Sequence, residues 1–203
     1  IGHGLGVKPS MIIIKNTGAV ENWVVYHGSL GAEKNIKLNN TEAQQDTTGA
    51  FNDTEPTSSV FTVHTNTNVN QSGQVMIAYC FAEKTGYSKF GSYTGNDNAD
   101  GTFVYTGFKP AWILFKEASQ SGQSWYIWDT TRDDNGNPLE EYIAVDGNAA
   151  EGGSGSTYMD YNSNGVKMRD TGTYLNGSGQ TYVYMAFAEA PLVGTNNVPC
   201  TAR

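Results

Sequence analysis

Residues 69–83 read VNQSGQVMIAYCFAE, and residues 175–189 read LNGSGQTYVYMAFAE. Each stretch begins with a polar turn that contains Ser-Gly-Gln and continues as an apolar run that ends in Phe-Ala-Glu. In each run both alternating sets of positions are apolar, which is typical of a strand that is covered on both faces. We therefore predict that both runs form central strands of β-sheets.

Two further blocks are repeated in the same order. Residues 6–15 (GVKPSMIIIK) correspond to residues 107–116 (GFKPAWILFK), and residues 22–27 (NWVVYH) correspond to residues 124–129 (SWYIWD). The second copy of each block follows the first after about 100 residues, the scale of a duplicated domain rather than of a solenoid repeat. The short apolar runs after each proline are typical of strands.

The composition favours an all-β fold, because the 203 residues include 24 glycines and only 16% of them are charged. We predict two tandem related β-sandwich units, jelly-roll-like and of about 100 residues each, that pack intimately against each other. The first unit spans residues 1–89, the second spans residues 90–189, and residues 190–203 form a C-terminal tail. The first residues take the place of TFVYTG in the second unit, so we expect a fragment whose first unit is truncated at its N-terminus.

Turn residues also suggest local structure at the junction of the two units. Residues 90–108 (FGSYTGNDNADGTFVYTGF) predict a hairpin, because an Asn/Asp/Gly cluster separates two alternating segments. No stretch predicts a convincing amphipathic helix. Residues 32–45 (AEKNIKLNNTEAQQ) are the best candidate and could form one short turn.

The charge balance excludes some classes of partner. The net charge is −8, with 12 Lys and Arg against 20 Asp and Glu. Nucleic-acid binding depends on neutralising phosphates, so we expect no nucleic-acid partner. No window approaches the roughly 18 consecutive apolar residues of a membrane-spanning helix, so we expect no membrane insertion.

The two cysteines lie in different settings. Cys80 falls inside the apolar run, and Cys200 falls in the C-terminal tail. A strand thiol and a tail thiol are poor partners, so we predict no disulfide and assign Cys80 to a small buried position without reactivity.

The sequence offers little for catalysis. The three histidines, His3, His27 and His64, form neither an HExxH motif nor a close pair, and no G-x-S-x-G motif occurs. Glu140 and Glu141 are adjacent, so on a strand their carboxylates would point apart instead of forming a glycosidase pair. We predict that the protein is not an enzyme and needs no cofactor, with Ca²⁺ as the one candidate ion.

The calcium hypothesis rests on the segment NDNADG. Asn96, Asn98 and Asp100 are spaced two residues apart before a glycine, as oxygen ligands are in calcium loops, but the glutamate at the twelfth position is missing. A plain Asn/Asp/Gly turn is the alternative.

Sugar recognition needs aromatic faces beside polar side chains, and the second unit offers both. Trp23 and Trp125 occupy matched positions, which indicates core packing. Tyr126 and Trp128 lie on the opposite face of their strand. We predict a ligand-binding set in the second unit, with candidates Tyr126, Trp128, Asp129, Asp133 and Asn135.

Several of these blocks also carry a family resemblance. The segments MIAYCFAEKTGYSKFGSYTGN and DGTFVYTGFKPAWILFK, together with the blocks quoted above, resemble a duplicated domain found in virion-associated, tail-fibre-like proteins of marine bacteriophages. The resemblance covers essentially the whole chain. It implies a virion or extracellular location and supplies no catalytic residues.

Three functional hypotheses follow from the residues and the resemblance. The first is a non-enzymatic virion surface domain that helps recognise a host-surface glycan or envelope component. The second is a structural module that packs against other virion proteins or copies of itself, and the third is a polysaccharide-degrading tail domain. By analogy with phage fibres, we expect a homo-oligomer, with a trimer as the natural candidate.

Overall fold

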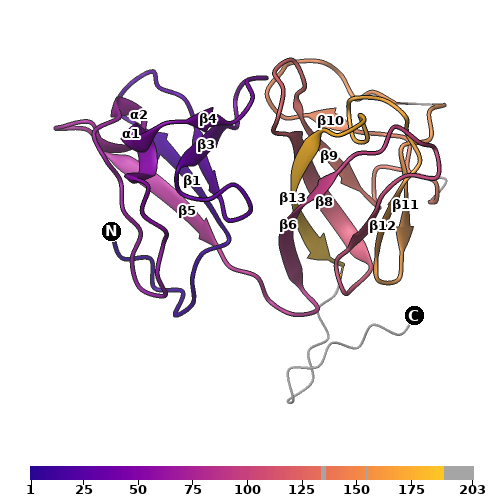
Figure 1. Ribbon diagram of the computed structural model, residues 1–203, viewed down its shortest axis with the longest axis horizontal. Helices are drawn as coiled ribbons and strands as arrows, with labels where there is room; N and C mark the ends of the chain where they lie inside the picture. The colour runs from indigo at the N-terminus through magenta and orange to yellow at the C-terminus, as the bar shows by residue number, and fades with distance from the viewer. Residues whose placement is uncertain (134–135, 154, 190–203) are drawn as a thin grey trace.

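A computed structural model describes residues 1–133, 136–153 and 155–189, and it shows an all-β protein (Figure 1). Within these residues, three antiparallel sheets contain thirteen strands. Two short helices, α1 (Thr48–Phe51) and α2 (Thr67–Asn70), lie beside the first sheet. The predicted all-β class is therefore confirmed.

The first five-stranded sheet comes from the N-terminal part of the chain. Its strand order is β4-β3-β2-β1-β5, and every neighbouring pair is antiparallel. Its strands are β1 (Met11–Asn16), β2 (Val24–His27), β3 (Lys34–Lys37), β4 (Gln45–Asp46) and β5 (Met76–Phe81).

The other two sheets come from the rest of the chain. The second five-stranded sheet has the order β10-β9-β8-β13-β6, and a three-stranded sheet has the order β11-β12-β7. Their strands are β6 (Ser88–Thr94), β7 (Phe103–Tyr105), β8 (Pro110–Glu117), β9 (Trp125–Asp129), β10 (Ile143–Ala144), β11 (Met159–Asn162), β12 (Gly165–Met168) and β13 (Thr181–Ala188).

The repeated sequence blocks pair in the same register in the two large sheets. Ile13 of β1 lies opposite Val25 of β2 and Tyr79 of β5. Its counterpart Leu114 of β8 lies opposite Ile127 of β9 and Met185 of β13. The order β3-β2-β1-β5 thus has the same connectivity as β10-β9-β8-β13.

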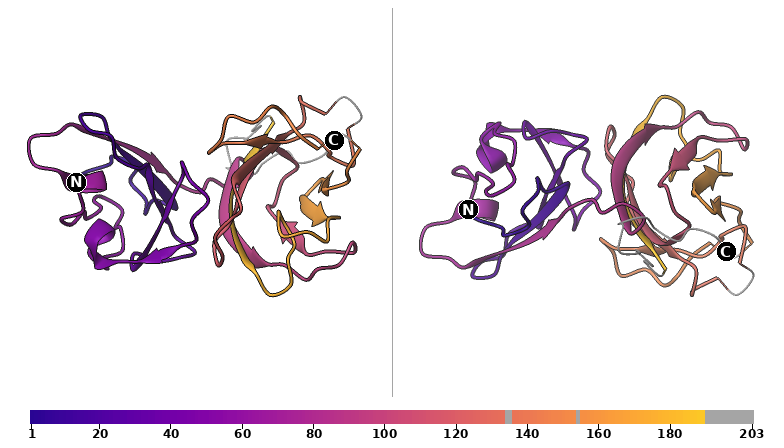
Figure 2. Two further views of the ribbon diagram at one scale, coloured as in Figure 1. Left: turned by 90° about the horizontal axis from the view of Figure 1, so that it is seen from above. Right: turned by 90° about the horizontal axis from the view of Figure 1, so that it is seen from below.

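The hydrophobic core is divided into three clusters. The middle cluster joins the two large sheets, which face each other in the views from above and below (Figure 2). A second cluster fills the space between the second sheet and the three-stranded sheet, and a third lies between the first sheet and the two helices. Alternate residues of each central strand therefore face two different cores.

Strand β5 differs from the prediction, because it lies at the edge of its sheet and is not covered on both faces. Val75, Ile77 and Tyr79 are 68%, 43% and 46% exposed. Only β1 pairs with β5, whereas β13, which has nearly the same sequence, lies between β8 and β6 and is buried as predicted. The prediction was wrong for β5 because burial depends on neighbouring strands that its own sequence does not specify.

Two local predictions are also wrong. Residues 90–108 do not form a hairpin, because β6 pairs with β13 and β7 pairs with β12 in another sheet. The stacked rings of Tyr93 and Tyr182, with centroids 5.0 Å apart, help to hold β6 on β13. Residues 32–45 contain β3 and the first residue of β4 instead of a helical turn.

The remaining expectations concern termini and thiols. Cys80 is a free, half-buried cysteine, and burial raises the pKa of its thiol, which disfavours the reactive thiolate. Cys200 and the tail, residues 190–203, lie outside the described residues. No helix in the described part of the chain has the length and apolar character needed to cross a bilayer.

Candidate ligand-binding site

Five aromatic rings meet against strand β9 of the second five-stranded sheet. Two come from β9, Tyr126 and Trp128, and three come from the segments that follow it, Tyr142, Tyr158 and Tyr174. We call these five residues the aromatic cluster. The rings belong to segments far apart in the sequence, so only the folded chain brings them together.

Tyr142 is the centre of the aromatic cluster. Its ring centroid lies 5.1 Å from that of Tyr126 and 5.4 Å from that of Trp128. The rings of Tyr158 and Tyr174 lie 5.5 Å and 6.2 Å from it. These separations fall in the range of favourable edge-to-face and tilted aromatic contacts, so each ring helps to hold the others in place.

Burial divides the cluster into a base and an outer surface. Tyr126 and Trp128, both predicted as ligand contacts, are buried and form the base. Tyr142 and Tyr158 are half-buried, and Tyr174 is 38% exposed. The three tyrosines were not predicted from the sequence, because they lie in residues 130–174, which are rich in polar residues and glycine and show no periodic pattern.

The hydroxyl groups of Tyr126 and Tyr158 remain protonated over the neutral range. The pKa of Tyr126 is raised to about 12, mainly by burial. Burial also raises the pKa of Tyr158, with smaller contributions from Tyr142 and the carboxylate of Asp170. Neutral phenols can both donate and accept hydrogen bonds, as the hydroxyl groups of a sugar require.

Two polar atoms near the cluster have no hydrogen-bond partner in the described part of the chain. They are the indole nitrogen Nε1 of Trp128 and the carboxylate oxygen Oδ2 of Asp170. Buried polar atoms are normally paired, so these two atoms could be satisfied by water or by ligand hydroxyl groups.

The polar residues predicted beside the aromatic rings have structural partners. Asp129 accepts hydrogen bonds from the backbone of Thr131 and Arg132 and forms an ion pair with the Arg132 guanidinium at 2.9 Å. Asp133 is buried and accepts a hydrogen bond from the backbone of Glu140. Both carboxylates therefore shape the loop that follows β9. Asn135 lies outside the described residues.

The predicted calcium-binding residues lie in a turn held by side-chain hydrogen bonds. Asn96 Oδ1 accepts from the backbone of Asn98, and Asn98 Oδ1 accepts from the backbone of Asp100. Asp100 pairs with Lys167 at 2.7 Å. The three oxygens thus have separate partners, the pattern of the alternative turn interpretation. Between residues 1 and 189, apart from the undescribed positions, no three His, Cys, Asp or Glu side chains form a metal-binding group.

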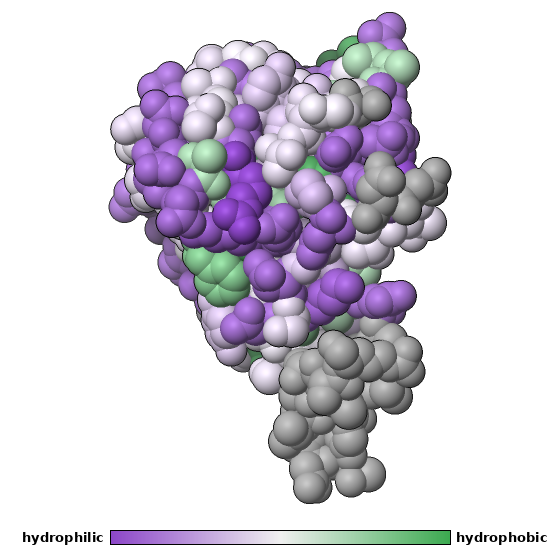
Figure 3. All heavy atoms as spheres, turned by 90° about the vertical axis from the view of Figure 1, so that its right-hand side faces the viewer, coloured by the Kyte–Doolittle hydropathy of each residue, from purple (hydrophilic) through white to green (hydrophobic). Residues whose placement is uncertain are grey.

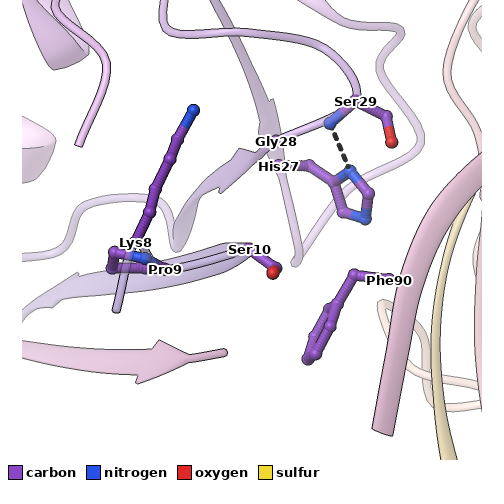
Figure 4. A pocket seen from close by; sticks show the side chains of 7 residues that line it. All are labelled: Lys8, Pro9, Ser10, His27, Gly28, Ser29 and Phe90. Atoms are coloured by element: carbon purple, nitrogen blue, oxygen red, sulfur yellow. Dashed lines mark hydrogen bonds between the residues drawn. The ribbon is translucent and has the colours of Figure 1, made fainter. Parts of the chain in front are cut away.

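A pocket of about 220 Å³ opens where the two large sheets meet (Figure 4). His27 lines the pocket opposite Phe90. Both nitrogens of its ring have hydrogen-bond partners: Nδ1 accepts from the Ser29 backbone at 3.2 Å, and Nε2 lies 3.1 Å from the carbonyl oxygen of Tyr184. Burial lowers the pKa of His27 to about 4, so the ring is neutral. The pocket is smaller than the roughly 300 Å³ of typical ligand sites.

Fold and site together define an all-β protein with two facing five-stranded sheets and an aromatic cluster against β9. The chain belongs to the family described as Domain of unknown function (DUF7483), which matches residues 1–191. No curated protein and no solved structure matches the chain.

Proposed function

We propose that this protein is a non-enzymatic surface domain of a phage virion or appendage that helps recognise a glycan on the host surface. The aromatic cluster carries the proposal. Tyr142, Tyr158 and Tyr174 present partly exposed rings on a rigid aromatic base, a surface suited to stacking against the C–H groups of a sugar ring. The virion and extracellular location rests on the sequence resemblance.

The surroundings of the cluster are compatible with a hydrated ligand. The face of the molecule that contains β11 and β12 is mostly hydrophilic, with small separate apolar groups (Figure 3). Glycans are bound by a few aromatic contacts within polar surroundings, whereas a stable protein interface has a larger apolar centre.

The absence of catalysis is part of the proposal. His27 has hydrogen bonds at both ring nitrogens. Glu117 is buried, and its carboxylate accepts hydrogen bonds from the backbone of Ser119 and Gln120. Both side chains thus have structural roles, and neither is positioned to act as a general acid, a general base or a nucleophile.

We also infer that the chain is built from two tandem related sandwich units, residues 1–89 and 90–189, of jelly-roll-like type. The matching registers of the repeated strands support this division. The shared middle cluster supports intimate packing of the units.

The alternative function is a structural module that assembles with other virion proteins or with further copies of the chain. One observation favours it: the exposed apolar residues of β5, whose counterparts in β13 are buried. Exposed apolar strands of this kind mark interaction surfaces.

Binding to purified host envelope polysaccharide and to intact marine bacteria would test the glycan proposal. We expect saturable, strain-selective binding that Tyr174→Ala lowers about tenfold, as expected for the loss of one stacking contact. Tyr105→Ala is the matched control, because Tyr105 is 62% exposed on β7 and makes no ring contact with the cluster. Equal loss in both variants, or no binding by the folded protein, would refute the proposal.

A further inference from the structure

The outer edge of β5 has unpaired backbone groups. On its inner side the Thr17 backbone N–H donates to the carbonyl of Val75 at 2.9 Å, so odd-numbered residues of β5 direct their backbone groups toward β1. Met76, Ala78 and Cys80 therefore direct their N–H and C=O groups away from the sheet. Within the described residues no strand pairs with this edge.

The side chains beside this edge are apolar. Ile77 and Tyr79 lie on one face of β5 and are exposed, as is Val75 immediately before the strand. The ring of Tyr79 stacks on Trp23, with centroids 6.4 Å apart and planes inclined by 20°. A flat apolar strand with an open edge is a template for pairing with another strand.

The second large sheet shows what covers the equivalent edge. Ala78 and Tyr184 hold the same position in their sheets, because they lie opposite Ile14 and Phe115 of the repeated strand. On β13 the outer edge is covered by β6, which pairs antiparallel and places Gly91 opposite Tyr184. The chain therefore contains its own template for a strand that pairs with β5.

We propose that the edge of β5 binds an extended partner strand with the chemistry of β6, antiparallel and in the register that β6 uses on β13. This register places an aromatic residue like Phe90 opposite Tyr79 and one like Tyr93 opposite Met76. The aromatic residue would cover the exposed ring of Tyr79. The proposal rests on the assembly alternative and names its partner; it does not depend on glycan binding.

One residue distinguishes the β5 edge from the β13 edge. A Cβ atom at Gly91 would lie 2.7 Å from Oη and 2.8 Å from Cζ of the buried Tyr184 ring, so only glycine fits opposite Tyr184. Opposite the small Ala78 there is no such ring. A β6 peptide with Gly91→Val therefore fits β5 and is excluded from β13, and valine also favours the extended conformation.

The experiment uses the whole chain and two fluorescent peptides that span residues 87–95, one native and one with Gly91→Val. We expect saturable binding by anisotropy, with the valine peptide at least as tight, and slowed hydrogen exchange at Met76, Ala78 and Cys80. In the protein, Ala78→Pro removes one outward N–H, and we expect about tenfold weaker binding. Proline is tolerated at sheet edges, and a melting curve verifies folding.

Two further variants keep the proposal testable if Ala78→Pro does not fold. Ile77→Lys and Tyr79→Lys leave the backbone intact and place charges on the exposed face, which should weaken binding of both peptides. The proposal would be overturned if neither peptide bound the protein. It would also be overturned if none of the three variants weakened the binding. If the protein dimerised without binding either peptide, and Ala78→Pro abolished the dimer, the partner of β5 would be a second copy of this chain and the proposal would be overturned. Glycan binding by the same variants should be unchanged, so the two proposals can fail separately.

Discussion

The imidazole of His27 in β2 connects the two large sheets, because its Nε2 lies 3.1 Å from the carbonyl oxygen of Tyr184 in β13. The Ser29 backbone N–H donates to Nδ1, so Nε2 carries the proton and donates to Tyr184. The neutral tautomer thus satisfies both the Ser29 N–H and the Tyr184 carbonyl. The contact joins residues 157 positions apart in the sequence.

The His27 contact predicts a loss of stability in acid. Burial lowers the folded-state pKa to about 4 from 6.5, so the unfolded chain binds a proton first as the pH falls. The stabilisation is present above pH 6.5 and is lost between pH 6.5 and pH 4, by about 3 kcal/mol at most.

Urea unfolding of the native protein and of His27→Gln at pH 7, 5.5 and 4.5 would measure this loss. The variant should lack this part of the pH dependence, although the carboxylates contribute equally to both proteins. The same pH dependence in the two proteins would contradict the assigned role of His27.

Buried Lys116 predicts a gain of stability in alkali, with the same direction of pH dependence as His27. Burial lowers its pKa from 10.5 to about 8, although Glu117 and Asp146 act in the other direction. The folded state therefore releases the proton first, and stability rises as the pH increases from 8 to 10.5, by about 3 kcal/mol at most.

The difference in unfolding free energy between the native protein and Lys116→Met isolates this effect, because the tyrosines titrate in both. We expect the native protein to gain stability relative to the variant across that interval. A constant difference would show that the Lys116 amine is solvated in solution.

Gly91 predicts a steric requirement in β6. In Gly91→Ala the new methyl group would lie within 3 Å of three atoms of the buried Tyr184 side chain, so the strand or that side chain must move. We expect a loss of about 2 kcal/mol in the free energy of unfolding. Gly147→Ala is the control, since its nearest atom would be 3.9 Å away. Equal effects in the two variants would exclude the clash.

The contacts of Asn176 predict that the turn at residues 96–98 depends on its buried side-chain amide. Its Oδ1 accepts from the Asn96 backbone at 3.0 Å, and its Nδ2 lies 2.9 Å from Asn96 Oδ1 and from the carbonyls of Asn98 and Asp170. Asn176→Ala should lower the unfolding free energy by about 3 kcal/mol, because it leaves several groups unpaired.

Thermal melting would compare Asn176→Ala with Asn98→Ala, whose side chain is exposed and makes one local hydrogen bond. We expect the second variant to lose under 1 kcal/mol. A Ca²⁺-dependent rise in melting temperature that Asp100→Asn removes would instead support the calcium hypothesis.

The repeated blocks made much of the strand pairing predictable. Ile13 and Leu114 occupy the same place in the repeat, and each pairs with the matching residues of its neighbours. Alternation within a strand states which residues share a face, so the core positions of Trp125 and Val183 could be predicted as well. The aromatic cluster could not, because Tyr142, Tyr158 and Tyr174 come from irregular segments without a periodic pattern.

The sequence alone determined the all-β class, the repeat and the alternating faces, because these depend on local side-chain order along each strand. The tertiary structure alone decided which strand lies at an edge and which rings meet. Tyr79 and Met185 occupy equivalent positions in nearly identical strands, yet Tyr79 is exposed and Met185 is buried. The physical reason is that burial of a strand is a property of its neighbours: β6 covers β13, and no described strand covers β5.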